Sequence, residues 1–152
     1  MKKNLLLSLV LLITMHAFSQ KYKKPADSVR LNIEYIKVQN DITQLTSKLT
    51  IAQNELPGYN ARAGEAEKDA KNAAQASSDQ ASKATDGSVK DARRAKKKAN
   101  KALTEAKDAR HAENKEKDQE KKIASLTKEL EKKQARMQQL EEMRQTIRNI
   151  QQ

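Results

Sequence analysis

The amino-acid sequence predicts an all-α protein: a long antiparallel coiled-coil hairpin with an alanine-rich tip and a leucine- and isoleucine-rich base. Alanines recur in mirror order on the two sides of Gly87, and larger apolar residues recur at heptad spacing before and after them. Of the 152 residues, 34% are charged and 3% are aromatic, so large apolar side chains are too few for a globular core. Disorder is the alternative for so polar a chain, but a disordered chain has no need of periodic apolar residues.

Residues 1–19 are typical of a secretory signal peptide. Two lysines precede an apolar run over residues 5–13, and the small residues Ala17 and Ser19 fit positions −3 and −1 of a cleavage site. The run is too short to span a bilayer as a helix, and the sequence has no cysteine for a lipid anchor or a disulfide. We therefore expect export to a bacterial periplasm, no transmembrane anchor after cleavage, and a basic lead over residues 20–26.

A first helix is predicted over residues 27–56. Asp27 or Ser28 can cap it, because their side-chain oxygens accept the free N–H groups of the first turn. Its apolar residues alternate steps of four and three, which is an uninterrupted heptad seam. They are Leu31, Tyr35, Val38, Ile42, Leu45, Leu49, Ala52 and Leu56.

Pro57 and Gly58 predict a break after this helix. Proline disfavours the helical conformation of the residue before it, and glycine supplies the freedom of a turn. A second helix is then expected over residues 60–86. The break is either a local kink within one hairpin arm or a full reversal, and a reversal would give a three-helix arrangement instead.

A turn at Gly87 is expected to separate the second helix from a third over residues 88–150. Gly87 suits the left-handed residue that ends a helix, and Ser88 with Asp91 matches the capping box that begins one. The later part of the third helix carries an apolar stripe, which Lys133 and Gln134 interrupt. The stripe consists of Ile123, Leu126, Leu130, Met137, Leu140, Met143, Ile147 and Ile150.

The mirror order of the alanines predicts which residues of the two arms face each other. The predicted pairs are Ala84 with Ala92, Ala81 with Ala95, Ser77 with Ala99, Ala74 with Ala102 and Ala70 with Ala106. The leucine-rich pairs are Leu56 with Ile123, Leu49 with Leu130 and Ile42 with Met137, which is a register shifted by three residues. An extended loop at residues 57–60 would explain this shift, because an extended residue advances ~3.3 Å and a helical one ~1.5 Å. The eleven-residue steps Ala70–Ala81–Ala92 predict a tip that is nearly straight or weakly right-handed.

Six cations occur within nine residues after the turn and form the candidate binding site for an anion or a partner. They are Arg93, Arg94, Lys96, Lys97, Lys98 and Lys101. The alternative is an ordinary solvated helix face. Lipopolysaccharide, acidic glycans and unfolded acidic polypeptides are the candidate anions in an envelope. Nucleic acid is not expected, because the cluster has no aromatic residue for base stacking and the chain carries an export signal.

No residue pattern indicates catalysis, and we expect no catalytic site, no cofactor and no metal. His111 is the one histidine after the signal peptide, so no second histidine or cysteine can complete a metal site with it. Glu113, Glu116 and Glu120 lie among lysines at helical spacing, which suits ion pairing rather than acid–base chemistry. The sequence therefore does not predict an enzyme.

The signal peptide, the small basic chain and the long helical arms together resemble the Skp/OmpH family of periplasmic chaperones. That resemblance implies a holdase whose coiled-coil arms grip unfolded outer-membrane proteins. The family trimerises through a small β-body beside the arms, whereas residues 20–30 and 140–152 contain no strand-like run. The hairpin also resembles the helical arms of efflux adaptor proteins, which lie between β-domains.

The expected function is that of an exported, non-catalytic coiled-coil protein, a structural spacer or protein-interaction rod in the bacterial envelope. The alternatives are a Skp/OmpH-like holdase and a protein that binds lipopolysaccharide or glycan through its basic arm. We also expect a homo-oligomer. Val29, Ile33 and Ile36 lie off the main seam, and Tyr35 and Met143 are further apolar groups that two helices are not expected to cover.

Overall fold

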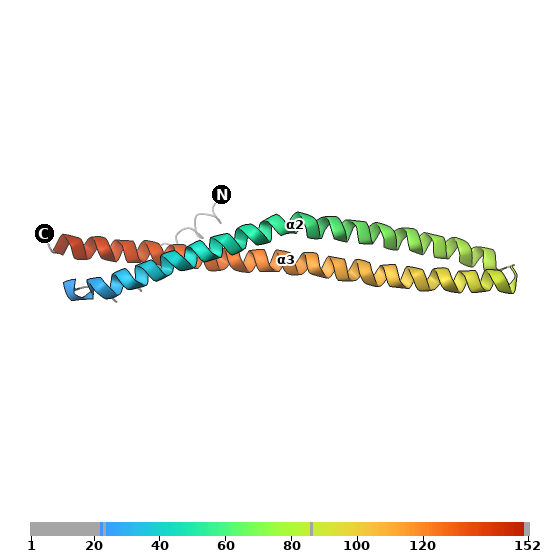
Figure 1. The fold of residues 1–152 in the computed structure, drawn as a ribbon, viewed down its shortest axis with the longest axis horizontal. Coiled ribbons are helices and arrows are strands. Elements are labelled where there is room, and N and C mark those ends of the chain that lie inside the picture. Colours follow the sequence, from blue (N-terminus) through green and yellow to red (C-terminus); the bar gives the residue numbers. More distant parts are fainter. Residues whose placement is uncertain (1–21, 23, 86, 151–152) are drawn as a thin grey trace, which may run out of the picture. The chain divides into compact units, whose positions relative to one another are not determined.

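The computed structural model describes residues 22, 24–85 and 87–150, which form one short 3-10 turn and two long α-helices (Figure 1). The turn η2 spans Pro25–Asp27, α2 spans Ser28–Thr85 and α3 spans Val89–Ile150. The two helices pack against each other as a hairpin, and no strand occurs among the described residues. The predicted all-α hairpin is thus confirmed. The predicted signal peptide lies outside the described residues, as does part of the basic lead.

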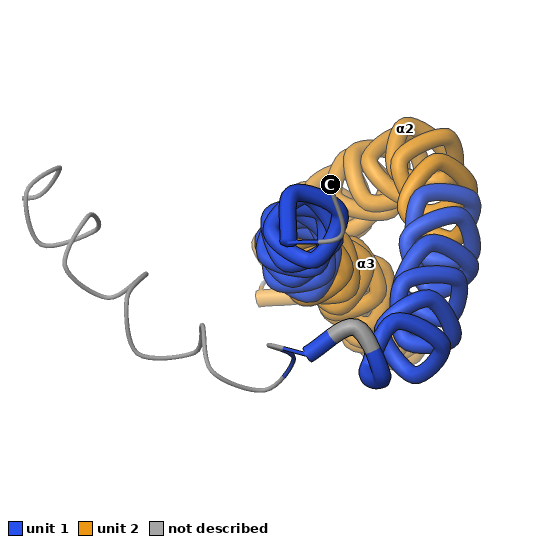
Figure 2. The backbone as a smooth tube through the Cα atoms, turned by 90° about the vertical axis from the view of Figure 1, so that its left-hand side faces the viewer, with its two compact units in different colours: residues 1–47, 128–152 blue, residues 48–127 orange. Residues whose placement is uncertain are grey.

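The described residues belong to two compact units, shown in different colours in Figure 2. We call residues 22–47 with 128–150 the leucine-rich unit, and residues 48–127 the alanine-rich unit. Each unit contains one stretch of α2 and one stretch of α3.

The leucine-rich unit holds a small apolar core between its two helices. Leu31 and Leu140 are fully buried, and partly buried Ile42 and Met137 pack against the same cluster. Met143 is also buried, so the expectation that two helices leave it uncovered is wrong. The buried side chains of this unit are Tyr22, Leu31, Val38, Leu45, Leu140, Met143 and Ile147.

Polar contacts between α2 and α3 border this core. The Lys133 ammonium lies 2.6 Å from an Asp41 carboxylate oxygen, and the Arg136 guanidinium donates to Glu34 at 2.6 and 3.0 Å. Lys133 therefore interrupts the apolar stripe of α3 in sequence, but in the structure it joins the two helices. Tyr35, which is half-buried, lies beneath the Arg144 guanidinium at 4.3 Å from the ring centre.

α2 continues without interruption through Pro57 and Gly58, so the predicted break is wrong. Pro57 removes one helical N–H donor and costs about 3 kcal/mol in a helix interior. Both residues lie on the exposed side of α2, while Leu56 and Tyr59 beside them are half-buried on the side facing α3. Packing of this side against α3 keeps the segment helical, because tertiary burial outweighs the local preference. A three-helix arrangement is thereby excluded.

The seam of the alanine-rich unit keeps the heptad spacing that begins at Leu31. On α2 the inward positions are Leu49, Ala52, Leu56, Tyr59, Ala63, Ala66, Ala70, Ala73, Ser77, Gln80 and Ala84, none of which is exposed. On α3 they include Asp91, Ala95, Ala102, Glu105, Ala109, Ala112, Glu116, Gln119, Ile123 and Leu126. No eleven-residue step interrupts either series.

Every alanine pair predicted from the mirror order has one exposed member, so that register is wrong. Exposed are Ala74, Ala81, Ala92, Ala99 and Ala106. The physical reason is the continuity of α2: without an extended loop at residues 57–60, no shift of register is needed, and one heptad phase runs through the helix.

The turn between the helices differs from the expected glycine cap. No described glycine has a positive φ, so Gly87 is not left-handed. A Cβ at this position would instead lie 2.6 Å from the Lys83 carbonyl oxygen and 3.0 Å from the Asp91 Cβ. Position 87 therefore requires glycine, because the Lys83 backbone and the Asp91 side chain leave no room for a Cβ. One half of the predicted capping box is present, since the Ser88 N–H donates to the Asp91 carboxylate at 3.1 Å. The Ser88 hydroxyl donates to the same carboxylate at 2.8 Å, and the Asp91 N–H donates to the Ser88 carbonyl oxygen instead.

The start of α2 also has a side-chain contact at its first residues. The Lys24 N–H donates to the Asp27 carboxylate at 3.3 Å, and Asp27 ends η2 just before α2 begins at Ser28. Asp27 thus caps the short turn, and the helix proper begins one residue later than predicted.

Candidate functional sites

All six cations of the predicted site are exposed on α3, in the alanine-rich unit. The heptad phase divides them into two groups, because Ala95 and Ala102 face α2 and set the orientation of the helix. Arg93, Lys96 and Lys97 lie on the side turned away from α2, and none of the three has an ion-pair partner within the described part of the chain.

The other cations lie beside acidic groups. Lys98 and Lys101 line a shallow groove of about 230 Å³ together with Asp69 and Glu105. Asn72, Ala73 and Ala76 complete its lining. Because the groove carries both signs of charge, it is a poor site for a free anion. The structure therefore does not bring the six cations together as one site.

Arg94 lies 3.5 Å from the Asp91 carboxylate. Hydrogen bonds from the Ser88 side chain and backbone lower the pKa of Asp91 below its ordinary value, with Arg94 adding to the effect. Asp91 is the acid nearest in sequence to the exposed cations, and Ser88 and Arg94 already occupy its oxygens.

Farther along α3, the predicted pairing of charges is present. Lys117 donates to Glu113 one turn before it. This hydrogen bond lowers the pKa of Glu113 and raises that of Lys117, as expected for an exposed pair at i, i+4 spacing. His111 is exposed, and no group of metal-ligating side chains occurs among the described residues.

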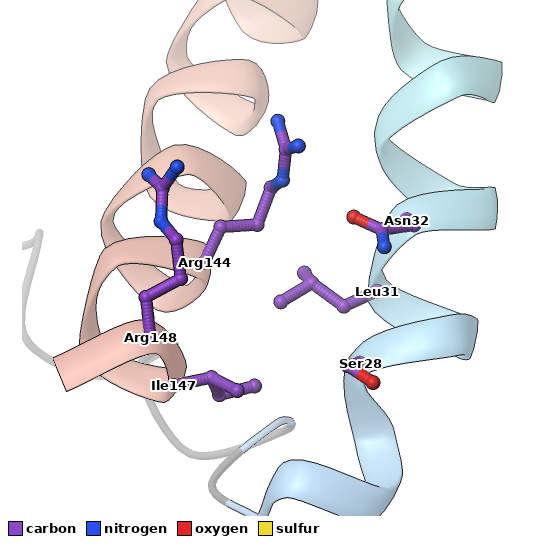
Figure 3. A pocket seen from close by; sticks show the side chains of 6 residues that line it. All are labelled: Ser28, Leu31, Asn32, Arg144, Ile147 and Arg148. Carbon is purple, nitrogen blue, oxygen red and sulfur yellow. The ribbon is translucent and has the colours of Figure 1, made fainter. Parts of the chain in front are cut away.

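A second groove, of about 180 Å³, lies in the leucine-rich unit (Figure 3). Leu31 from α2 and Ile147 from α3 point toward each other, Arg144 projects from α3 into the space between the helices, and Arg148 extends along α3. Both guanidinium groups pair with Glu141, at 3.1 and 3.3 Å. The groove is thus a small gap between packed side chains, in which two guanidinium groups share one carboxylate.

Apolar side chains in water are the other prominent surface feature. Val29, Ile33 and Ile36 are 67%, 63% and 56% exposed, and their i, i+4, i+7 spacing places them on one face of α2. The sequence predicts this row. It does not single out Val89 and Leu103, which are 73% and 57% exposed on α3. The heptad phase of α3, continued back from Leu126 and Ile123 toward the turn, is the signal that reveals their outward position.

Gln119 is a buried polar residue, and no apolar pattern in the sequence singles it out. Its side-chain amide donates to the Ala52 carbonyl oxygen at 2.7 Å and to Glu55 at 3.2 Å. This contact joins α3 to α2 one turn before Pro57 and fixes their register there.

Neither α2 nor α3, over the residues described, contains a segment apolar and long enough to cross a lipid bilayer. No family model, curated protein or solved structure matches the sequence.

Proposed function

We propose that this chain is a non-catalytic, exported coiled-coil protein that serves as a spacer and interaction rod in the bacterial envelope and associates with copies of itself through α2. A hairpin of two helices has little interior, and ten of the described residues are buried. Nearly all side chains therefore lie on surfaces, which suits contact with other molecules better than chemistry in a dry cleft.

The observation that carries the proposal is the exposed row Val29, Ile33 and Ile36 beside the core of the leucine-rich unit. Large apolar side chains arranged along one helix face gain free energy when another surface covers them, by about 25 cal/mol for each Å² removed from water. A second hairpin covers such a row in a four-helix bundle.

Sedimentation of the chain without residues 1–19 tests this proposal. We expect an oligomer for the natural sequence and a monomer for the double variant Ile33→Gln, Ile36→Gln. The matched control is Ile51→Gln, Leu103→Gln, which replaces two equally exposed residues elsewhere and should leave the oligomer intact. A natural sequence that sediments as a monomer at high concentration would refute self-association.

A holdase is the second candidate, and the exposed cations Arg93, Lys96 and Lys97, which form no ion pair among the described residues, favour it. Such a protein should suppress aggregation of an unfolded outer-membrane protein near equimolar ratio, less effectively at high salt. A spacer should leave the aggregation unchanged, so one light-scattering measurement distinguishes the two functions.

A further inference from the structure

We infer that the outward face of α3 next to the turn, where exposed Val89 and Leu103 bracket Arg93, Lys96 and Lys97, docks onto an anionic lipid surface. The inference concerns the alanine-rich unit alone and is independent of self-association through α2.

The charge of this face is uncompensated. Between Ala92 and Ala102 α3 carries six cations and no acid. Arg93, Lys96 and Lys97 are exposed, are turned away from α2, and form no ion pair within the described residues. Cations held side by side on a rigid helix attract a surface of fixed negative charge, and the attraction weakens as salt is added.

Two apolar side chains on the same face distinguish a lipid surface from a soluble polyanion. Val89, Lys96 and Leu103 follow one another at intervals of seven residues, so they share a heptad position and a side of the helix. Val89 and Leu103 lie about 21 Å apart along the helix axis, at 1.5 Å per residue. At a membrane both can enter the boundary between headgroups and acyl chains, as in a helix lying in the interface.

The absence of aromatic side chains from this face argues against nucleic acid. The three tyrosines are Tyr22, Tyr35 and Tyr59, all on the N-terminal side of the turn. Single-stranded nucleic acid binds through base stacking on aromatic rings in addition to charge. A face of lysine, arginine and two aliphatic side chains matches phosphate headgroups and hydrocarbon instead.

Co-sedimentation with vesicles tests the inference. We expect the chain without residues 1–19 to bind vesicles of phosphatidylglycerol and phosphatidylcholine in about equal parts, and not vesicles of phosphatidylcholine alone. The variant Arg93→Gln, Lys96→Gln, Lys97→Gln should bind at least about tenfold more weakly, since each cation near the surface adds to the attraction. Circular dichroism should show unchanged helicity, because all three side chains are exposed.

The matched control is Lys48→Gln, Arg62→Gln, Lys68→Gln, which removes the same charge from exposed positions on α2. It should retain most of the binding. Equal loss in the two triple variants would overturn the inference, because binding would then follow net charge and not this face.

A second variant, Val89→Ser with Leu103→Ser, separates the lipid surface from a soluble polyanion. It should weaken binding to the anionic vesicles severalfold while leaving binding to dextran sulfate unchanged. If it binds the vesicles as the natural sequence does, the face recognises polyanions in general, and the proposed lipid docking is wrong.

Discussion

The helices of both units meet along seams of the same heptad spacing, and the units differ in the size of the side chains in those seams. The leucine-rich unit buries seven side chains between α2 and α3, including Leu31 and Leu140. The buried residues of the alanine-rich unit, as far as the structure describes it, are Ala52, Ala73 and Gln119. The two seams thus share one spacing, but the size of the side chains determines how much free energy their packing provides.

Ion pairs also join the two helices of the leucine-rich unit, whereas those described in the alanine-rich unit do not. In the leucine-rich unit Lys133 with Asp41 and Arg136 with Glu34 join one helix to the other. The ion pairs found in the described alanine-rich unit lie within single helices, at i, i+3 or i, i+4 spacing. Pairs within a helix support helicity by about 0.2–0.5 kcal/mol each but do nothing to hold two helices together. We therefore expect the alanine-rich unit to open more readily, with faster hydrogen exchange.

The largest expected effect is that of truncating the core. Leu140→Ala should lower the free energy of unfolding by about 2–5 kcal/mol, since it removes a fully buried side chain and leaves a cavity between the helices. Urea unfolding followed by circular dichroism measures this loss.

The control for this truncation is Leu103→Ala, the same substitution at a mostly exposed position of the alanine-rich unit. It should change stability by less than about 0.5 kcal/mol. Comparable losses for the two variants would show that the leucine-rich core does not dominate stability, and the comparison between the units would fail.

The second-largest expected effect concerns Pro57, which lies within the continuous helix α2. Pro57→Ala should raise the stability of the alanine-rich unit by up to about 3 kcal/mol, because it restores a helical N–H and removes a steric clash at an exposed position. Slower hydrogen exchange of the amides around residue 57 is the measurement. Gln53→Ala, one turn earlier and also exposed, should leave exchange nearly unchanged. No slowing in Pro57→Ala would mean that the helix carries no strain at the proline.

The sequence suffices to predict the leucine-rich seam and not the alanine-rich one. Leu31, Val38 and Leu45 belong to a heptad series of apolar residues that continues to Leu56, whereas the second apolar row of α2 ends at Ile36, so the longer series identifies the buried side. Alanine occurs on both sides of the helix: Ala73 is buried and its neighbour Ala74 is exposed. The phase there depends on whether α2 passes through Pro57. The local preferences of proline and glycine disfavour a helix through residues 57 and 58, and packing of α2 against α3 keeps this segment helical.

The candidate site likewise has one property that the sequence predicts and one that it does not. The exposure of the six cations is predictable from their long charged side chains, which reach water even where, as at Lys98, the heptad spacing from Asp91 and Glu105 turns the position toward α2. Which of the cations point away from α2 depends on the heptad phase of α3, which runs back from Leu126 and Ile123 to Asp91. Lys98 therefore lines a groove with Glu105, whereas Lys97 beside it faces outward, a distinction that composition cannot supply.

Alanine substitutions at two glycines, one in the turn and one within α2, should have smaller effects of opposite sign on stability. Gly87→Ala should destabilise the hairpin by about 1–3 kcal/mol, because the new methyl group would approach the Lys83 carbonyl oxygen to 2.6 Å and displace the backbone. Gly64→Ala should stabilise α2 by about 0.5–1 kcal/mol, since nothing lies within 4 Å of the added Cβ and alanine favours the helix. Thermal unfolding of both variants provides the measurement. A stabilising Gly87→Ala would show that the turn is looser than the structure describes.

The smallest effect concerns the ion pair that joins the helices of the leucine-rich unit. The hydrogen bond from Lys133 lowers the pKa of Asp41 below the ordinary value of 3.8, with further attraction from Lys37. A carboxyl group whose pKa is lowered by folding stabilises the folded state above its unfolded pKa, and this contribution disappears as the pH falls through the folded pKa. Asp41→Asn should therefore be less stable than the natural sequence at neutral pH, and the difference should shrink below pH 3.8.

Neighbouring positions supply the control for this pH dependence. Lys132 is exposed and has no ion-pair partner among the described residues, so Lys132→Gln should leave the pH profile of unfolding unchanged. The Lys133→Gln variant should reproduce the profile of Asp41→Asn, because either substitution removes the same contact between α2 and α3. Added salt should reduce the difference, since both side chains are about one third exposed. If Asp41→Asn and Lys133→Gln instead change the profile independently, the two residues do not act as a pair, and the apolar core and the Arg136–Glu34 ion pair hold the helices of the leucine-rich unit without them.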